Sequence, residues 1–153
     1  MDPRGADVNG SKLIFPGLAD FYAKMEPIAY TITRVVFGFI MIMHGWPKWT
    51  RGAEAIGNAF ANNYGLPRWF APLAIFFEVV GGAALIAGLA TRFFASALAI
   101  ELLFAMFAAH WAKGFSVGGG GYEYVMFLGF VCFYIAIRGG GPYSVDARIG
   151  KEL

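Results

Sequence analysis

The amino-acid sequence predicts an all-α membrane protein, an antiparallel four-helix transmembrane bundle with short interfacial helices. The first observation is composition: 58% of the 153 residues are hydrophobic and only 14% are charged, whereas soluble domains average about 25% charged residues. A soluble domain of this length would lack the polar residues that cover its surface. The second observation is that the apolar residues fall into four long stretches. A net charge of +2 argues against a nucleic-acid binder, and a hydrophobic soluble bundle is the alternative fold.

Each of the four stretches approaches the length that crosses a bilayer as a helix, which is about 20 apolar residues. The first stretch is opened by Pro27, which suits a helix start, and is closed by Gly45 and Pro47. Only Thr91 and Arg92 join the second stretch to the third, so we expect these two helices to be antiparallel neighbours. The predicted spans are residues 28–43, 70–90, 93–111 and 122–137.

Two further segments have the pattern of helices that lie on a membrane surface. Apolar residues with helical spacing occur near the start of the chain at Leu18, Phe21, Tyr22 and Met25, and again after the first span at Ala53, Ile56 and Phe60. This pattern suits interfacial helices, although either segment could be a connecting helix packed on protein. The predicted organisation is a polar N-terminal extension with an interfacial helix (1–26), a four-helix membrane domain (27–138) and a short cytoplasmic tail (139–153).

The distribution of Lys and Arg predicts the orientation, because cytoplasmic loops carry an excess of these residues. The side with both termini has Arg4, Lys12, Lys24, Arg92, Arg138, Arg148 and Lys151, against Lys48, Arg51, Arg68 and Lys113 on the other. All four tryptophans fall on that other side, where their rings favour the headgroup layer. We therefore predict a multi-pass protein of the plasma membrane with both termini in the cytoplasm. Residues 1–12 are polar and are not expected to act as a cleavable signal peptide.

Two opposite charges lie at matching depths inside the predicted spans. Arg34 precedes His44 by ten residues and Glu101 precedes His110 by nine, which places both about 14–15 Å below the outer ends of their helices. Ionised side chains inside a bilayer need partners, so we predict a buried Arg34–Glu101 ion pair. Such a pair could fix the register of the helices, or it could handle protons or substrate.

A second group of polar residues is predicted at the non-cytoplasmic ends of the spans, where it could form a binding mouth. The candidate catalytic residues, which could exchange protons, are Glu78, Glu123 and His110. The candidate substrate-binding residues are His44, Lys48, Lys113, Trp111 and Tyr124. For the two histidines the alternative role is a hydrogen bond to loop backbone.

The residue types of this mouth allow several ligands. A quinone headgroup needs a few hydrogen-bond donors beside an aromatic channel that opens to lipid. Such a channel could be lined by Phe76, Phe77, Phe107, Trp111 and Tyr124. Zinc or iron could use the histidines with a glutamate, but the spacing of a metal motif is missing, and beyond two histidines nothing indicates haem. We therefore predict no metal site.

Cysteine usage excludes a further kind of chemistry. Cys132 is the single cysteine of the chain, so a disulfide or a CxxC redox pair cannot form within it. Because Cys132 lies in an apolar run, we expect a buried thiol that behaves as a small hydrophobic group.

Several short motifs follow one another along the chain. They are HGWPK at residues 44–48, EVVGG at 78–82, GLATR at 88–92, KGF at 113–115, GGYEY at 120–124 and PYSVD at 142–146. In order and spacing they resemble the DoxX family of small integral membrane proteins, over residues 34–146. Two features depart from the family pattern: Lys113 stands where the family more often has Asn, and the N-terminal extension is unusually long.

The resemblance implies a four-helix protein of a bacterial inner membrane, associated with oxidoreductase systems that include thiosulfate:quinone oxidoreductase-like complexes. The expected function is that of a subunit of such a system, with a quinone as the candidate cofactor or a redox partner protein bound at the non-cytoplasmic mouth. The alternative is a non-catalytic carrier of small solutes or a membrane scaffold. The lipid bilayer is the expected environment, no nucleic acid is expected as a partner, and the sequence leaves a homo-oligomer open.

Overall fold

The computed structural model describes residues 13–152, and within them every regular element is a helix. Three continuous helical segments of this part of the chain are long and apolar enough to cross a membrane: Pro16–Arg51, Phe70–Ala87 and Thr91–Lys113. The fourth predicted span corresponds to α6 (Glu123–Arg138), which has 16 residues. The polar residues 1–12, with the prediction about a signal peptide, lie outside the described residues.

The first long helix, α1 (Ala19–Arg51), has 33 residues and contains both Pro27 and Pro47. The predicted separation into an interfacial helix and a shorter span is therefore wrong, because the helix continues through Pro27. The expected stop at Pro47 is also wrong. Membrane helices tolerate proline where neighbouring helices, polar side chains or local adjustments satisfy the backbone carbonyl that the proline leaves without its donor.

The second and third long segments each change from α-helix to a π-helical turn. The second consists of α3 (Phe70–Phe76), the π-turn η3 (Phe77–Gly81) and α4 (Gly82–Ala87). The third consists of α5 (Thr91–Ala105), the π-turn η4 (Met106–His110) and a short 3-10 turn, Trp111–Lys113. The remaining elements of residues 13–152 are the shorter helices α2 (Ala53–Tyr64) and α7 (Val145–Ile149) and the 3-10 turns Pro16–Leu18 and Val117–Gly119. The helix predicted around residues 53–60 is thus confirmed as α2.

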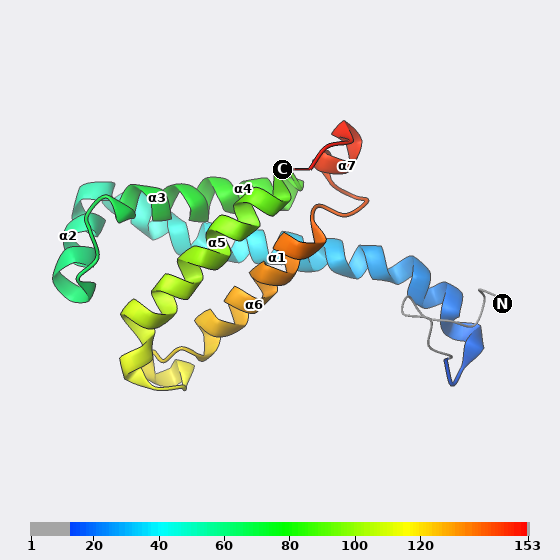
Figure 1. The fold of residues 1–153 in the computed structure, drawn as a ribbon, viewed down its shortest axis with the longest axis horizontal. Coiled ribbons are helices and arrows are strands. Elements are labelled where there is room, and N and C mark those ends of the chain that lie inside the picture. Colours follow the sequence, from blue (N-terminus) through cyan, green and yellow to red (C-terminus); the bar gives the residue numbers. More distant parts are fainter. Residues whose placement is uncertain (1–12, 153) are drawn as a thin grey trace.

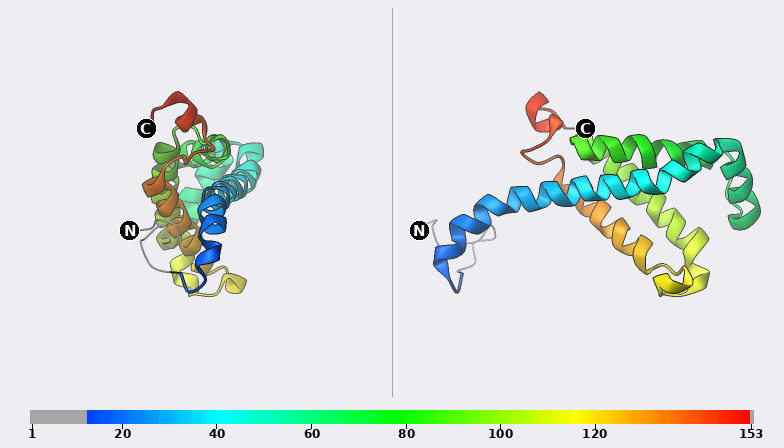
Figure 2. Two further views of the ribbon diagram at one scale, coloured as in Figure 1. Left: turned by 90° about the vertical axis from the view of Figure 1, so that its right-hand side faces the viewer. Right: turned by 180° about the vertical axis from the view of Figure 1, so that it is seen from behind.

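The long helices form two pairs that cross obliquely (Figures 1 and 2). In one pair α3, η3 and α4 run back along α1, and in the other α6 runs back along α5. The backbones of the first pair approach closely: a Cβ placed at Gly38 would lie 2.5 Å from the carbonyl oxygen of Gly82. The chain is therefore all-helical with membrane-length helices, and the regular four-helix bundle is not confirmed.

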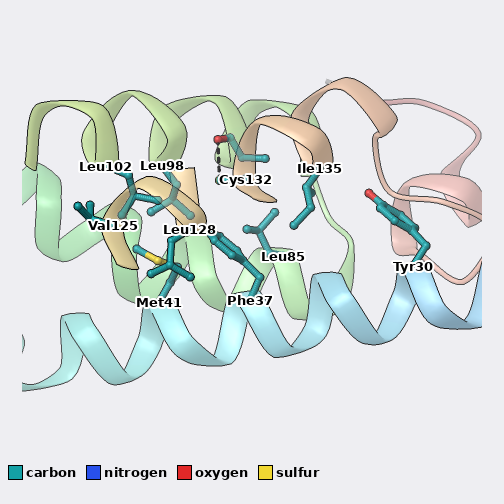
Figure 3. Close-up of a cluster of buried hydrophobic side chains, with 11 residues drawn as sticks. Tyr30, Phe37, Met41, Leu85, Leu98, Leu102, Val125, Leu128, Cys132 and Ile135 are labelled. Atoms are coloured by element: carbon teal, nitrogen blue, oxygen red, sulfur yellow. Dashed lines mark hydrogen bonds between the residues drawn. The ribbon is translucent and has the colours of Figure 1, made fainter. Parts of the chain in front are cut away.

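Buried side chains from both pairs meet in one core (Figure 3). This core cluster includes Phe37 and Met41 of α1 and buried side chains of α4, α5 and α6. Cys132 is fully buried there, and its thiol donates a hydrogen bond to the carbonyl of Ala95 at 3.0 Å. The predicted role of Cys132 as a small buried hydrophobic group is confirmed.

At the end of the two helix pairs nearest α7, charged side chains bind the backbone where helices meet (Figure 1). Arg34 of α1 is fully buried, and its guanidinium donates hydrogen bonds to the carbonyls of Leu85 at 2.5 Å, Ile86 at 3.2 Å and Tyr143 at 3.0 Å. Gly88 leaves room for this guanidinium, because a Cβ there would lie 2.4 Å from the Nη1 atom of Arg34. We call the contacts of Arg34, Arg92, Asp146 and Glu152 the terminal network.

The predicted Arg34–Glu101 ion pair is wrong. Arg34 lies beside Gly88, at the turn between α4 and α5, whereas Glu101 lies ten residues into the helix that begins after that turn, about 15 Å along it. The prediction measured the depth of Arg34 from His44 as a helix end, but α1 continues to Arg51. Three backbone carbonyls take the place of the carboxylate.

The segment after α6 closes the terminal network. The carboxylate of Asp146 accepts hydrogen bonds from the amides of Ala90 at 2.7 Å and Thr91 at 2.9 Å, the start of α5. Helix starts have amide groups without partners inside the helix, and Asp146 supplies the partner from 55 residues further along the chain. Arg92 pairs with Glu152 at 2.6 Å and also donates to carbonyls at the end of α6. The segment predicted as a tail is thus packed onto the helices.

Candidate functional site

A pocket of about 340 Å³ lies between the two helix pairs, toward their ends away from the terminal network. Its apolar wall includes Met41, Leu102, Val125 and Leu128. Its polar lining comes from α1, η3, η4 and α6, and consists of His44, Lys48, Glu78, His110 and Tyr124. Five of the eight candidate catalytic and substrate-binding residues thus line one pocket.

The strongest polar contact of this pocket joins Lys48 and Glu78. The Nζ atom of Lys48 lies 2.5 Å from Oε1 and 2.6 Å from Oε2 of Glu78. The Glu78 side chain is only 7% exposed and that of Lys48 is 28% exposed. Burial strengthens the attraction between the charges, but it also removes their hydration, so each depends on the other. Lys48 keeps enough exposure to reach the pocket as well as the carboxylate.

The path of α1 explains how these two side chains meet. Because the helix continues through Pro47, His44 and Lys48 lie one turn apart on the same face. Gly45 faces the other helix of the pair, where a Cβ would lie 2.7 Å from the Cβ of Glu78. The missing side chain at Gly45 lets the backbones approach, so that Glu78 comes within reach of Lys48.

Each of the two π-turns within residues 13–152 carries a polar side chain of the pocket. Glu78 is the second residue of η3, and His110 is the last residue of η4. A π-turn inserts one extra residue into a helix and rotates the following face, and such turns occur frequently at functional sites. The two turns thus aim an acid and an imidazole into the same space.

Glu101 belongs to this end of the molecule and not to the terminal network. It directly precedes Leu102, which lines the pocket, and the charged groups that act on its carboxyl are Glu78 and Lys48. Its Oε2 atom is buried and accepts or donates no hydrogen bond within residues 13–152. Buried polar atoms without partners are rare in folded proteins. Two carboxyl groups thus share the vicinity of one ammonium.

His110 is held by the loop that covers the pocket. Its Nδ1 atom lies 2.7 Å from the carbonyl oxygen of Gly120. A carbonyl can only accept, so the Nδ1 atom carries a proton that points at Gly120, and the Nε2 atom is the ring nitrogen that stays available to other groups. The alternative role predicted for the histidines, a hydrogen bond to loop backbone, is confirmed for His110. The ring of His44 instead packs near Tyr124, with centroids 6.1 Å apart.

Three predicted site residues lie outside the pocket lining. Glu123 accepts a hydrogen bond from the amide of Val117 at 3.0 Å and so closes the loop before α6. Trp111 is half-exposed and stacks on Tyr122, with centroids 4.7 Å apart. Lys113 is exposed. The prediction grouped these residues by depth alone, and depth does not fix the direction of a side chain.

The prediction that five aromatic residues line a channel at the pocket is wrong. Of its five proposed residues only Tyr124 lines the pocket, whereas Phe76, Phe107 and Trp111 are exposed on the outside of the helices. Within residues 13–152 no group of three or more His, Cys, Asp and Glu side chains could hold a metal ion.

Comparisons with known proteins place this arrangement in a family. The DoxX family model matches residues 29–111, which is more than half of the chain and includes His44, Lys48 and Glu78. The chain belongs to the DoxX family. Its loop before α6 and the whole of α6, with Glu123 and Tyr124, lie beyond the part that the family model matches.

Individual relatives extend the DoxX similarity over most of the chain. "Inner membrane protein YqjF" of Escherichia coli (strain K12) is 29% identical over 133 residues, which is 84% of this chain and 98% of the relative. "Putative oxidoreductase CatD" of Bacillus subtilis (strain 168) is 27% identical over 128 residues, which is 84% of this chain and 92% of the relative. No solved structure matches the chain significantly. The comparisons and the apolar helices together identify a DoxX membrane protein.

Proposed function

We propose that the protein is the membrane subunit of an oxidoreductase system and binds a quinone headgroup in the pocket formed by His44, Lys48 and Glu78. The observation that carries this proposal is the Lys48–Glu78 pair, which brings two opposite charges to the wall of an otherwise largely apolar pocket. Ionisable groups inside a membrane protein are costly and therefore mark functional sites. The printed name of the Bacillus subtilis relative, an oxidoreductase, supports the same class.

The residues of the pocket fit a quinone. Its headgroup is a flat apolar ring with two carbonyl oxygens, so it needs apolar walls and hydrogen-bond donors. Met41, Leu102 and Leu128 provide such walls, and the ammonium of Lys48 and the hydroxyl of Tyr124 are donors. The volume of about 340 Å³ lies within the range of about 300–1,000 Å³ that is typical of small-molecule sites.

The residues of the chain would bind the headgroup and move protons. Reduction of a quinone to the quinol takes up two electrons and two protons. Lys48 would hold a carbonyl oxygen, while the carboxyl group of Glu78 and the imidazole of His110, which line the pocket, would pass protons. Glu123, the other acid predicted for this task, does not line the pocket. The single Cys132 cannot cycle between a dithiol and a disulfide, so the electrons would come from a redox partner protein.

A binding experiment with matched lysine variants tests this proposal. The purified protein in lipid nanodiscs is titrated with ubiquinone-2, which carries a short isoprenoid tail, and binding is followed by tryptophan fluorescence. We expect Lys48→Gln to weaken binding by about 10- to 100-fold, because a hydrogen bond from a charged group contributes about 1.5–3 kcal/mol. Lys113→Gln makes the same chemical change outside the pocket and should leave the affinity unchanged.

The proposal is wrong if the wild-type protein does not bind the quinone, or if both lysine variants bind it equally well. Movement of a solute across proteoliposomes without any change in redox state would favour the carrier alternative. Both termini are proposed to be cytoplasmic, which places the pocket at the non-cytoplasmic side. Labelling of an introduced surface cysteine from either side of intact cells checks this orientation.

A further inference from the structure

A second cavity lies directly against the pocket. We infer that the ligand of the pocket has a long hydrocarbon tail, and that this tail lies in an apolar groove between α5 and α6. The inference rests on the proposed function and specifies its substrate class: a lipid-soluble quinone with an isoprenoid tail, in place of a small soluble quinone.

The groove has the size and the chemistry of a tail-binding site. Its volume is about 460 Å³, and its lining is apolar along its whole length. Side chains on its rim point away from the core and are half-exposed or more, among them Ile100, Leu103, Phe130 and Phe133. Within a bilayer, such a groove opens toward lipid and admits a hydrocarbon chain from the side.

The groove and the polar pocket share a wall. Leu102 of α5 and Val125 of α6 line both cavities. Their exposed fractions are only 8% and 7%, and they lie at the same end of the core cluster (Figure 3). The two cavities are therefore adjacent, one polar and one apolar, and these two side chains divide them. A ligand with its head in the pocket and its tail in the groove would pass between Leu102 and Val125.

Gly129 of α6 creates the space in the middle of the groove. A Cβ at this position would lie 3.9 Å from the Cβ of Leu102, which is an ordinary contact, so the helices do not need a glycine here in order to pack. A leucine at the same position would extend into the groove. Gly129 thus provides a substitution that fills the groove without forcing the helices apart.

A helix of a partner or of a second copy fits the groove less well. Helix pairs in membranes associate through faces of small residues that let the backbones approach. Here the rim consists of large side chains such as Phe130, Phe133 and Leu103. A partner helix would also leave unexplained why the groove shares a wall with the charged pocket.

The test compares a quinone headgroup with and without a tail. Wild type, Gly129→Leu and the control Ala83→Leu are placed in the same lipid nanodiscs and titrated with ubiquinone-0, which has no tail, and with ubiquinone-2. Ala83 is exposed on α4 and lines neither cavity. We expect Gly129→Leu to weaken binding of ubiquinone-2 by at least about tenfold, because the leucine side chain overlaps the space that the tail occupies. Binding of ubiquinone-0 should not change, and Ala83→Leu should match wild type.

Other outcomes separate the inference from the proposed function. If wild type binds neither quinone, both are wrong. If wild type binds both quinones through Lys48, but Gly129→Leu leaves ubiquinone-2 unaffected or weakens both equally, only the tail groove is wrong. A ubiquinone-2 analogue with an azide at the end of its tail gives a second measurement on unaltered protein. Photolabelling of α5 and α6 at the groove supports the inference, and labelling elsewhere overturns it.

Discussion

The two ends of the paired helices both bury charged side chains, but the contacts of these side chains differ. In the terminal network, Arg34 and Asp146 bind backbone carbonyls and amides, and they join segments that are far apart in the chain. At the pocket, Lys48 and Glu78 bind each other beside free volume, and Glu101 retains a buried oxygen that has no partner within the described residues. The comparison shows that the buried charges of one end bind the backbone and join helices, whereas Lys48 and Glu78 at the other end bind each other and line a cavity.

The largest expected effect is on the terminal network. Arg34→Leu should lower the free energy of unfolding by about 3–5 kcal/mol, because it leaves three backbone carbonyls inside the protein without their charged donor. Equilibrium unfolding in detergent micelles measures this loss. Arg34→Lys should recover only part of it, since one ammonium cannot reach carbonyls on both sides as the guanidinium fork does. Wild-type stability of the leucine variant would contradict the structural role.

A smaller loss is expected at the start of α5. Asp146→Ala removes the acceptor for the amides of Ala90 and Thr91, and loss of such a helix cap costs about 2 kcal/mol. Asp20→Ala is the control, because Asp20 is an exposed acid in the first turn of α1 and should contribute less than about 1 kcal/mol. The same unfolding assay measures both variants, and equal losses would argue against the cap.

The smallest effect on stability is expected near the pocket, at Glu101. This prediction distinguishes a Glu101 beside the pocket from a Glu101 that pairs with Arg34. Glu101→Gln keeps the shape of the side chain and breaks no hydrogen bond of the described residues, so the free energy of unfolding should change by less than about 1 kcal/mol. If Glu101 were the partner of Arg34, the same substitution would cost about 3–5 kcal/mol. A double variant with Arg34→Leu separates the two cases, since independent sites give additive losses.

Much of the helical framework could be predicted from hydrophobic stretches and their boundaries. The predicted spans 70–90, 93–111 and 122–137 agree closely with Phe70–Ala87, Thr91–Lys113 and α6. The first span was misjudged because proline stops helices in water, whereas α1 continues through two prolines. Local sequence patterns contain no information on the neighbouring helices that make such a helix stable.

The candidate site could be predicted only in part, because the sequence indicates which residues lie near the same helix ends but not how the helices cross. His44, Lys48, Glu78, His110 and Tyr124 do line one pocket, because residues near the same ends of neighbouring helices come together. The partners of Arg34 and Glu101 could not be predicted in the same way. The partners of these two side chains depend on the length of each helix and on the angle at which the two helix pairs cross. A count of residues from an assumed helix end determines neither the length nor the crossing. The groove beside Gly129 likewise exists only through the packing of α5 against α6.

The contact between Asp146 and the start of α5 has a consequence for biosynthesis. A ribosome adds residues at about 5–20 per second, so α1 to α5 have emerged before Asp146 is made, and the junction around Arg34 stays incomplete during that interval. Until the segment with Asp146 is made and binds, the amides of Ala90 and Thr91 and the carbonyl of Gly88 have no partner from that segment. Premature termination after α6 should therefore yield a product that inserts normally and yet is recognised by quality-control proteases.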